Sequence, residues 1–248
     1  MDSFLTGIRE TVVVKDDGKH GPLPLLLLGM TVVTGLVDSF SYLALGHVFV
    51  ANATGNVVFL GFAVAGAPGF SIAASLVALG AFGLGAFIGG TIGSRLGRHR
   101  GRLLSTAATI QSVFVAGAVV LAAISASPVA GGYRYALIVA LAVAMGIQNA
   151  TARKLAVPDL TTTVLTLTIT GLAADSVSPG AKGSVAGRRL ISMAAMLAGA
   201  LVGAALVVHG NRVYGLVIAL LVTVAVAATA HILGSSDPTW VVGESAGD

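Results

Sequence analysis

The chain of 248 residues contains no cysteine, which excludes a disulfide framework and a cysteine metal site. Charged residues are scarce, at 10%, and aromatic residues make up only 6%. Apolar residues dominate instead, because 56% of the chain is hydrophobic and 33 residues are glycine. This composition lies far outside that of soluble globular domains and predicts an integral membrane protein surrounded by a lipid bilayer.

Enzyme signatures are missing as well. The sequence has no Gly-x-Ser-x-Gly elbow, no phosphate-binding loop, no His-Glu-x-x-His and no histidine pair with metal-ligand spacing. We therefore expect no enzyme, no cofactor and no metal, and keep a membrane-embedded enzyme as a third hypothesis only. The net charge of +4 comes from basic residues that flank apolar segments, so no nucleic-acid partner is expected.

Apolar runs long enough to cross a bilayer, roughly 17 to 25 residues, define the organisation. They lie near 22–46, 48–66, 70–93, 103–125, 134–153, 160–176, 189–208 and 213–233. We expect a polar N-terminal segment over 1–20 without a removed signal peptide, and one membrane domain over 21–233. A flexible tail over 234–248 would place Trp240 at the membrane interface.

Basic residues decide how many runs cross, because short loops that hold lysine and arginine usually stay in the cytoplasm. If all eight runs cross, the 14 basic residues divide evenly between the two sides. If 48–66 and 160–176 each enter and leave on one face, twelve lie inside and only Arg134 and Arg212 lie outside. The sequence thus predicts an all-α protein with six crossing helices and two re-entrant or broken segments. Eight crossing helices with parallel repeats remain the alternative.

Two similar polar motifs, about 111 residues apart, indicate an internal repeat. Gly35-Leu36-Val37-Asp38-Ser39 lies in the first run, and Gly146-Ile147-Gln148-Asn149-Ala150 lies at the matching place in the second half. The repeats would span about 22–125 and 134–233, and three crossings in each make them antiparallel, as in many transporters. The glycine-rich stretches 80–90 and 198–203 also correspond. We interpret them as helix-packing faces within or between subunits, which suggests self-association as a homo-oligomer.

Asp38 is the only acidic residue well inside a predicted span. A carboxylate there could exchange protons or bind a cation, or it could be structural, bonded to Ser39, Ser41 or a broken helix end. Gln148 and Asn149 occupy the equivalent place, so the second half carries amides instead of the acid. Arg153 and Lys154, one turn further, are interpreted as an inside anchor or as partners of an anionic group.

A polar stretch follows each of these motifs. The first holds Asn52, Thr54 and Asn56 around Gly55, and glycine permits backbone angles that break a helix. The second concentrates hydroxyls in the equivalent place, and its candidate binding residues are Thr163, Thr166, Thr168 and Thr170. Either set could bind a solute or ion, or bridge neighbouring helices.

The stretch from Gly35 to Gly61, with Asp38 and Ala51-Asn52-Ala53-Thr54-Gly55-Asn56, resembles the YoaK-like family of bacterial inner-membrane proteins. Met145-Gly146-Ile147-Gln148-Asn149-Ala150 and its threonine run are similar to the family's second signature, although Thr166-Leu167-Thr168 stands where a Thr-Gly pair is common. The resemblance covers roughly 23 to 233 and implies a multi-pass protein of the inner membrane. It implies no substrate.

Our leading hypothesis is a small permease or channel-like transporter for an unknown small solute or ion. Its internal site would comprise Asp38, Asn52, Thr54, Asn56, Gln148, Asn149 and the threonines from 163 to 170. The alternative is a non-transporting membrane scaffold or accessory subunit, in which the polar motifs only hold helices together.

Overall fold

The structure is a computed structural model that describes residues 20–157, 160, 170, 183–236 and 240–241. Six helices in this part of the chain are long and apolar enough to cross a membrane. They are α2 (Leu23–Ala44), α4 (Ile72–Leu96), α5 (Arg100–Ile124), α6 (Gly131–Leu155), α8 (Gly183–Val208) and α9 (Arg212–Ser236). The shorter α3 (Ala53–Val64) has 12 residues and spans about 18 Å, well short of the roughly 30 Å that a crossing helix needs.

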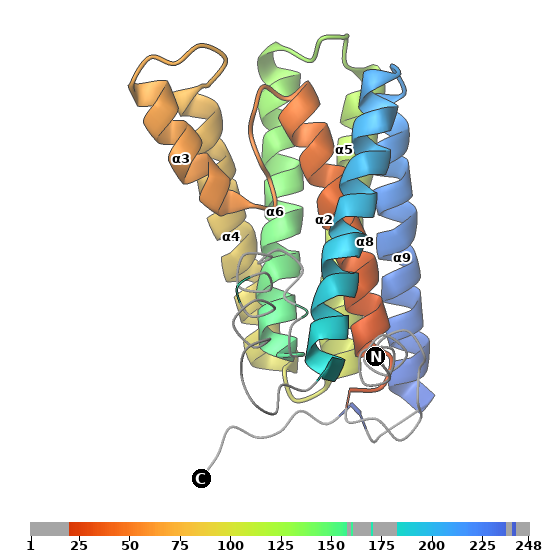
Figure 1. The fold of residues 1–248 in the computed structure, drawn as a ribbon. Helices are drawn as coiled ribbons and strands as arrows, with labels where there is room; N and C mark the ends of the chain where they lie inside the picture. The colour runs from red at the N-terminus through yellow and green to blue at the C-terminus, as the bar shows by residue number, and fades with distance from the viewer. Residues whose placement is uncertain (1–19, 158–159, 161–169, 171–182, 237–239, 242–248) are drawn as a thin grey trace.

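The path between α2 and α4 shows that the run 48–66 does not cross. After α2 the chain turns back into the bundle. α3 then returns to the end of the bundle where α2 ends, and α4 begins there (Figure 1). The six-crossing prediction is confirmed, and the eight-crossing alternative is wrong for this half. The second predicted re-entrant run, 160–176, lies outside the described residues apart from Leu160 and Thr170. α6 ends and α8 begins at one end of the bundle.

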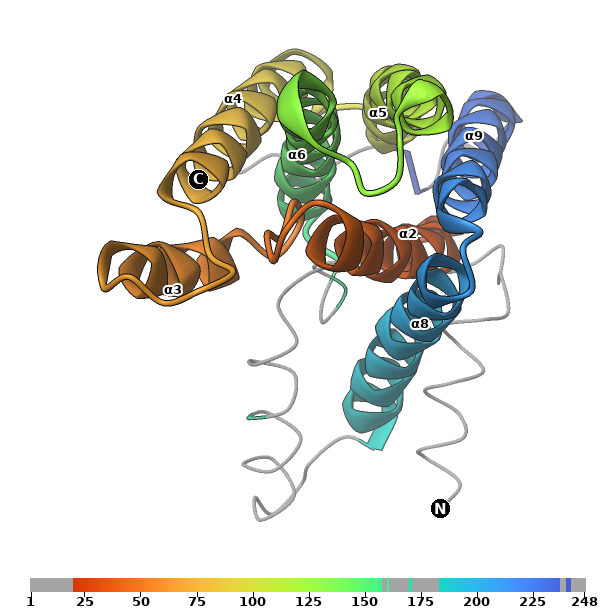
Figure 2. The same cartoon turned by 90° about the horizontal axis from the view of Figure 1, so that it is seen from above.

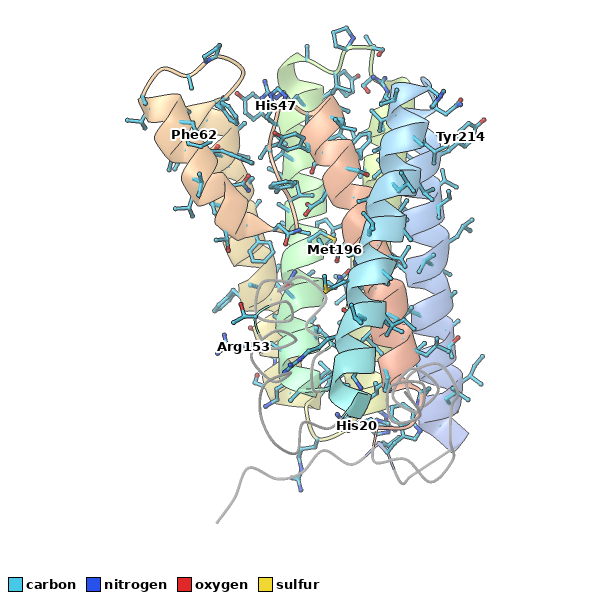
Figure 3. All side chains as sticks on the ribbon, in the orientation of Figure 1. His20, His47, Phe62, Arg153, Met196 and Tyr214 are labelled. Atoms are coloured by element: carbon cyan, nitrogen blue, oxygen red, sulfur yellow. The ribbon has the colours of Figure 1, made fainter. Side chains whose placement is uncertain are left out.

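Several basic residues lie at one end of the bundle, as the charge count for six crossings predicts. Arg95, Arg102 and Arg153 lie in the end turns of α4, α5 and α6, and Arg188 lies in the second turn of α8, all toward the end of the bundle where the described chain begins. By the positive-inside tendency this is the cytoplasmic end. Figure 3 shows His20 and Arg153 there, and His47 and Tyr214 at the opposite, outer end.

Glycines bring α2 and α8 into backbone contact. A Cβ added at Gly35 would lie 2.3 Å from the carbonyl oxygen of Met196, and one at Gly199 would lie 2.2 Å from that of Val32. Each distance is far below van der Waals contact, so only glycine permits this crossing.

The crossing of α4 with α6 repeats this geometry. A Cβ at Gly146 would lie 2.2 Å from the carbonyl oxygen of Phe82, and one at Gly85 would lie 2.2 Å from that of Val143. Gly146 and Val143 follow Gly35 and Val32 by 111 residues. The prediction that the glycine-rich stretches are helix-packing faces is therefore confirmed within the subunit for Gly85 and Gly199, whereas a Cβ added at Gly80, Gly83 or Gly90 would meet no neighbouring atom. Figure 2 shows the two crossings on opposite sides of the bundle.

Trp240 corrects one expectation about the tail. Its ring is only 2% exposed, and it fills a slot left by two glycines, Gly21 and Gly101. The backbone N–H of Arg100 donates to the carbonyl of Val241 at 2.9 Å, which holds the segment in place. Trp240 is therefore buried at the cytoplasmic end and is not an interfacial aromatic.

Candidate functional site at the start of the half-helix

Asp38 accepts hydrogen bonds from the residues that lead into α3. Its Oδ1 accepts from the backbone N–H groups of Val50, at 3.0 Å, and Ala51, at 2.8 Å. Its Oδ2 accepts from the backbone N–H of Asn52 at 3.2 Å and from the Asn52 side-chain amide at 2.5 Å. The carboxylate is 4% exposed, and these four contacts occupy its acceptor positions.

These contacts explain how the chain breaks its helical course inside the membrane. Three consecutive N–H groups have no helical acceptor, and each would cost several kcal/mol if left unpaired in hydrocarbon. They converge on one carboxylate, which also lies near the positive end of the α3 dipole. Of the two structural partners considered for Asp38, the broken helix end is the one observed. Ser39 and Ser41 donate instead to carbonyls of their own helix.

Asn56 makes a second connection between α3 and the descending loop. Its Nδ2 donates to the carbonyl of Phe49 at 2.5 Å, and its Oδ1 accepts from the Phe49 N–H at 2.9 Å. The Phe49 ring lies so close to Gly55 that a Cβ there would be 2.7 Å from it. The same ring stacks on Tyr42 with centroids 5.0 Å apart. Asn56, 1% exposed, therefore has a clear packing role.

The free polar groups of this region lie in the first turn of α3. The backbone N–H groups of Ala53 and Thr54 have no acceptor among the described residues, and neither does the hydroxyl of Thr54 have a partner there. Thr54 is exposed, whereas the Asn52 amide is held by Asp38. Of the predicted site residues in the first half, Thr54 keeps its whole side-chain hydroxyl available among the described residues, and Asn52 keeps its Oδ1.

Gln148 belongs to a different cluster. Its Nε2 donates to the carbonyl of Met30 at 3.1 Å and to the hydroxyl of Thr34 at 2.9 Å. Its Oε1 accepts from Nε2 of Gln111 at 2.7 Å. Thr34 precedes Asp38 by one turn of α2, about 6 Å along the axis. The two clusters are thus neighbours along α2, and no hydrogen bond among the described residues joins Gln148 to Asp38.

Gln111 was missed by the sequence reasoning. It is fully buried in α5, and its Oε1 has no partner among the described residues. An amide in the middle of a predicted crossing helix is a usable signal, because such groups are costly in lipid. Gln111 has no counterpart in the repeated motifs, so the repeat does not point to it.

The other predicted residues of the second half contribute less to the described site. Asn149 donates to the carbonyl of Met145 in its own helix at 2.9 Å. Thr163, Thr166 and Thr168 lie outside the described residues, and Thr170 is exposed. That the threonines meet Asp38 stays a prediction.

Arg153 and Lys154 lie exposed in the last turn of α6, at the cytoplasmic end. The aliphatic part of Lys154 runs along Gly93 and Gly97 of α4. Asp38 lies about 22 Å along α2 from that end. The positions fit the inside-anchor interpretation and not a partnership with Asp38.

Arg134 holds the outer end of α2, where the chain turns back. Its Nε donates to the carbonyl of Leu45 at 2.6 Å, and its guanidinium also reaches the carbonyl of Gly46 at 3.4 Å. Gly46 has a φ of +84°, which a side chain at this position would strain. The descending loop is thus held at both ends, by Arg134 above and by Asp38 below.

These features define a multi-pass α-helical membrane protein whose described residues form six crossing helices and a half-helix that starts inside the membrane. The sequence matches the family described as "Protein of unknown function (DUF1275)" over residues 26–229, and the chain belongs to this family. It is similar to the UPF0700 transmembrane protein YoaK of Bacillus subtilis (strain 168), with 34% identity over 150 residues. That match covers 60% of this chain and 65% of the relative.

The resemblance to a YoaK-like family is thereby confirmed. No solved structure matches the chain.

Proposed function

We propose that the protein is a permease or channel-like transporter of small polar solutes in the bacterial inner membrane. The observation that carries this proposal is the start of α3 inside the membrane, with the N–H groups of Ala53 and Thr54 and the Thr54 hydroxyl unpaired among the described residues. Irregular backbone at membrane depth is tolerated where it is buried in protein or lines a water-filled cavity. Because these groups lack a partner among the described residues, they support a start of α3 that lines a water-filled cavity.

The geometry assigns different work to the predicted site residues. Asp38 and Asn56 hold α3 in position, and Thr54 with the first N–H groups of α3 offers one hydroxyl and two donors to a solute. The negative charge of Asp38 offsets the positive end of the α3 dipole, which removes the attraction that a bare helix start has for anions. This favours neutral polar solutes, zwitterions or cations. A role of Asp38 in proton or cation coupling stays a prediction, because it requires the carboxylate to release at least one donor.

A non-transporting scaffold is the second candidate, and one observation favours it. The side chains of Asp38 and Asn56 are fully engaged within the chain, as in a motif that serves only to fix a half-helix. The two candidates differ in what they require of Thr54. A transporter needs water at this position, whereas a scaffold does not.

Thiol labelling tests this difference directly, because the chain has no cysteine of its own. We expect a cysteine at Thr54 to react with an impermeant reagent added from one side of the membrane. A cysteine at Phe87, which is 75% exposed on α4, should not react, because that side chain faces lipid. If the Thr54 cysteine is as unreactive as the Phe87 cysteine, the proposed water-accessible site does not exist.

Transport itself is measured with purified protein in liposomes, by light scattering after osmotic shock with ions, sugars, small amines and amino acids. Thr54→Val keeps the shape of the side chain and removes the hydroxyl, and it should lower the rate for the transported solute. Thr91→Val is the matched control, because the Thr91 hydroxyl bonds only to Phe87 of its own helix. If the wild type moves no solute and the Thr54 cysteine stays unreactive, the scaffold candidate replaces the transporter.

A further inference from the structure

A groove between α5 and α9 lies apart from the α3 region. Its volume is about 340 Å³, at the lower end of the range for small-ligand sites. Ser105 and Thr109 of α5 form one wall, and Val224, Ala228 and His231 of α9 form the other. The two helices lie side by side at the edge of the bundle (Figure 2). Because Thr109, Val224, Ala228 and His231 are exposed, the groove opens on the outer surface of the bundle.

The groove exists because α5 and α9 touch closely at the cytoplasmic end and carry small residues further into the membrane. At the cytoplasmic end Gly101 faces Gly234, and a Cβ added at Gly101 would lie 2.9 Å from the Cα of Gly234. Above this contact, Ala228 faces serine and threonine side chains that are too short to fill the space between the helices. Ser105 follows Gly101 by one turn, so the groove lies within the cytoplasmic half of the bilayer.

The walls are less polar than their residue names suggest. The hydroxyl of Thr109 donates to the carbonyl of Ser105 at 2.8 Å, and that of Ser112 donates to Ala108 at 2.8 Å. Hydroxyls that bond to their own helix leave mainly methyl and methylene groups facing outward. Apart from the imidazole of His231, such a surface suits a hydrocarbon chain better than a polar solute.

A cation stands at the cytoplasmic mouth of the groove. Arg102 precedes Ser105 by three residues and Thr109 by seven, which places it on the same face of α5. It is exposed, and its guanidinium has no hydrogen bond or ion pair among the described residues. Its position in the first turn of α5 corresponds to the level of the phospholipid headgroups.

We propose that this groove is a binding site for an anionic phospholipid of the cytoplasmic leaflet. One acyl chain lies along the groove between Thr109 and Ala228, and the phosphate pairs with Arg102. The charge of Arg102 selects an anionic headgroup, because basic residues next to the cytoplasmic surface attract anionic lipids. The apolar walls require a chain attached to that headgroup, so free phosphate does not bind.

Native mass spectrometry of the full chain in detergent tests the proposal, with phosphatidylglycerol titrated against phosphatidylcholine of the same chains. The wild type should bind phosphatidylglycerol more tightly, and Arg102→Gln should reduce that preference about fivefold, the amount expected for one basic residue near the surface. Arg95→Gln is the matched control, since Arg95 is an exposed arginine at the same end of the bundle, in α4. A preference that survives Arg102→Gln unchanged overturns the proposal.

The groove itself is tested by filling it. Ala228→Phe should abolish binding of the preferred lipid while the melting temperature stays near that of the wild type. Thr109→Leu, on the opposite wall, provides the same test if Ala228→Phe does not fold. A benzophenone-bearing phosphatidylglycerol should cross-link to peptides around Thr109 and Ala228. Cross-links that spread evenly over the lipid-facing helices would indicate ordinary bilayer contact. Disulfide-linked dimers of an Ala228→Cys variant would indicate that a second copy of the chain covers the groove. Either result contradicts the site.

Discussion

Replacing Asp38 tests whether its carboxylate only holds the start of α3 in place or also couples transport to protons or cations. Asp38→Ala removes the acceptor of three backbone N–H groups, at Val50, Ala51 and Asn52, and of one side-chain amide. An N–H group left unpaired in a buried place costs about 1–3 kcal/mol, so three of them cost roughly 3–9 kcal/mol before the structure relaxes. Whole domains are stable by only about 5–15 kcal/mol, so this variant should be near the limit of folding.

Asp38→Asn should cost less, for a reason that the geometry supplies. The asparagine oxygen can keep the two contacts with Val50 and Ala51, and the Asn52 amide can turn to accept from the new NH₂ group. Only the N–H of Asn52 then loses its acceptor, and the remaining bonds lose their charge. We expect a loss of about 2–4 kcal/mol, which corresponds to one stranded N–H and two weakened hydrogen bonds.

Unfolding in mixed micelles measures this ranking. Titration with sodium dodecyl sulfate, followed by circular dichroism and by the fluorescence of the single tryptophan, Trp240, should give stabilities in the order wild type, Asp38→Asn, Asp38→Ala. Ser39→Ala is the control, because that hydroxyl bonds only to Leu36 of its own helix, and it should change stability by less than about 0.5 kcal/mol. Wild-type stability of Asp38→Ala, together with a loss of transport in Asp38→Asn, would refute the anchoring argument and support coupling.

Three further perturbations test the fold. Gly35→Ala and Gly146→Ala should each destabilise the protein by about 1–3 kcal/mol in the same micelle titration, because each added methyl group overlaps a backbone carbonyl of the crossing helix. Gly83→Ala is the control and should be neutral, because its methyl group meets open space. Equal effects at all three glycines would contradict the crossings. Trp240→Ala should lower stability by about 3–5 kcal/mol, and an unchanged melting temperature would show that the ring does not pack in solution. A cysteine at Ala67, in the loop between α3 and α4, should label from outside the cell, and labelling only from the cytoplasm would reverse the topology.

The crossing helices were predictable because their length and apolarity are local properties of the chain. The six expected crossing runs match the six long helices, although α8 begins at Gly183, earlier than the predicted 189. The start of α3 was less predictable. The expected run begins at 48, but the helix begins at Ala53 because the N–H groups from Phe49 to Asn52 bond to the side chains of Asn56 and Asp38. Hydropathy carries no trace of such contacts.

The candidate site was predicted in part for the same reason. Asp38 was identifiable as a lone acid in a span, but its partners are backbone N–H groups, which no side-chain pattern encodes. Gly35 and Gly146 make similar close contacts with a crossing helix, but the expectation from the repeat that Asp38 and Gln148 share one site is not matched by their hydrogen bonds. Positions related by a pseudo-twofold axis meet only if they lie on that axis. The bonds of Gln148 to Thr34 and Gln111 place it beside α2 at a different level.

Arg134 and Arg212, the two basic residues expected outside, show why the charge count predicts the topology although it leaves two residues on the outer side. Arg134 binds the carbonyls of Leu45 and Gly46 beyond the end of α2, and Arg212 binds those of Ser125 and Ala126 beyond the end of α5. Both helix ends carry unpaired carbonyls and the negative end of a helix dipole, and a cation satisfies both needs. An arginine that is bound in this way has a structural reason to lie outside. The exposed basic residues that lack such contacts are then the ones that report orientation, and in the described chain they gather at the cytoplasmic end.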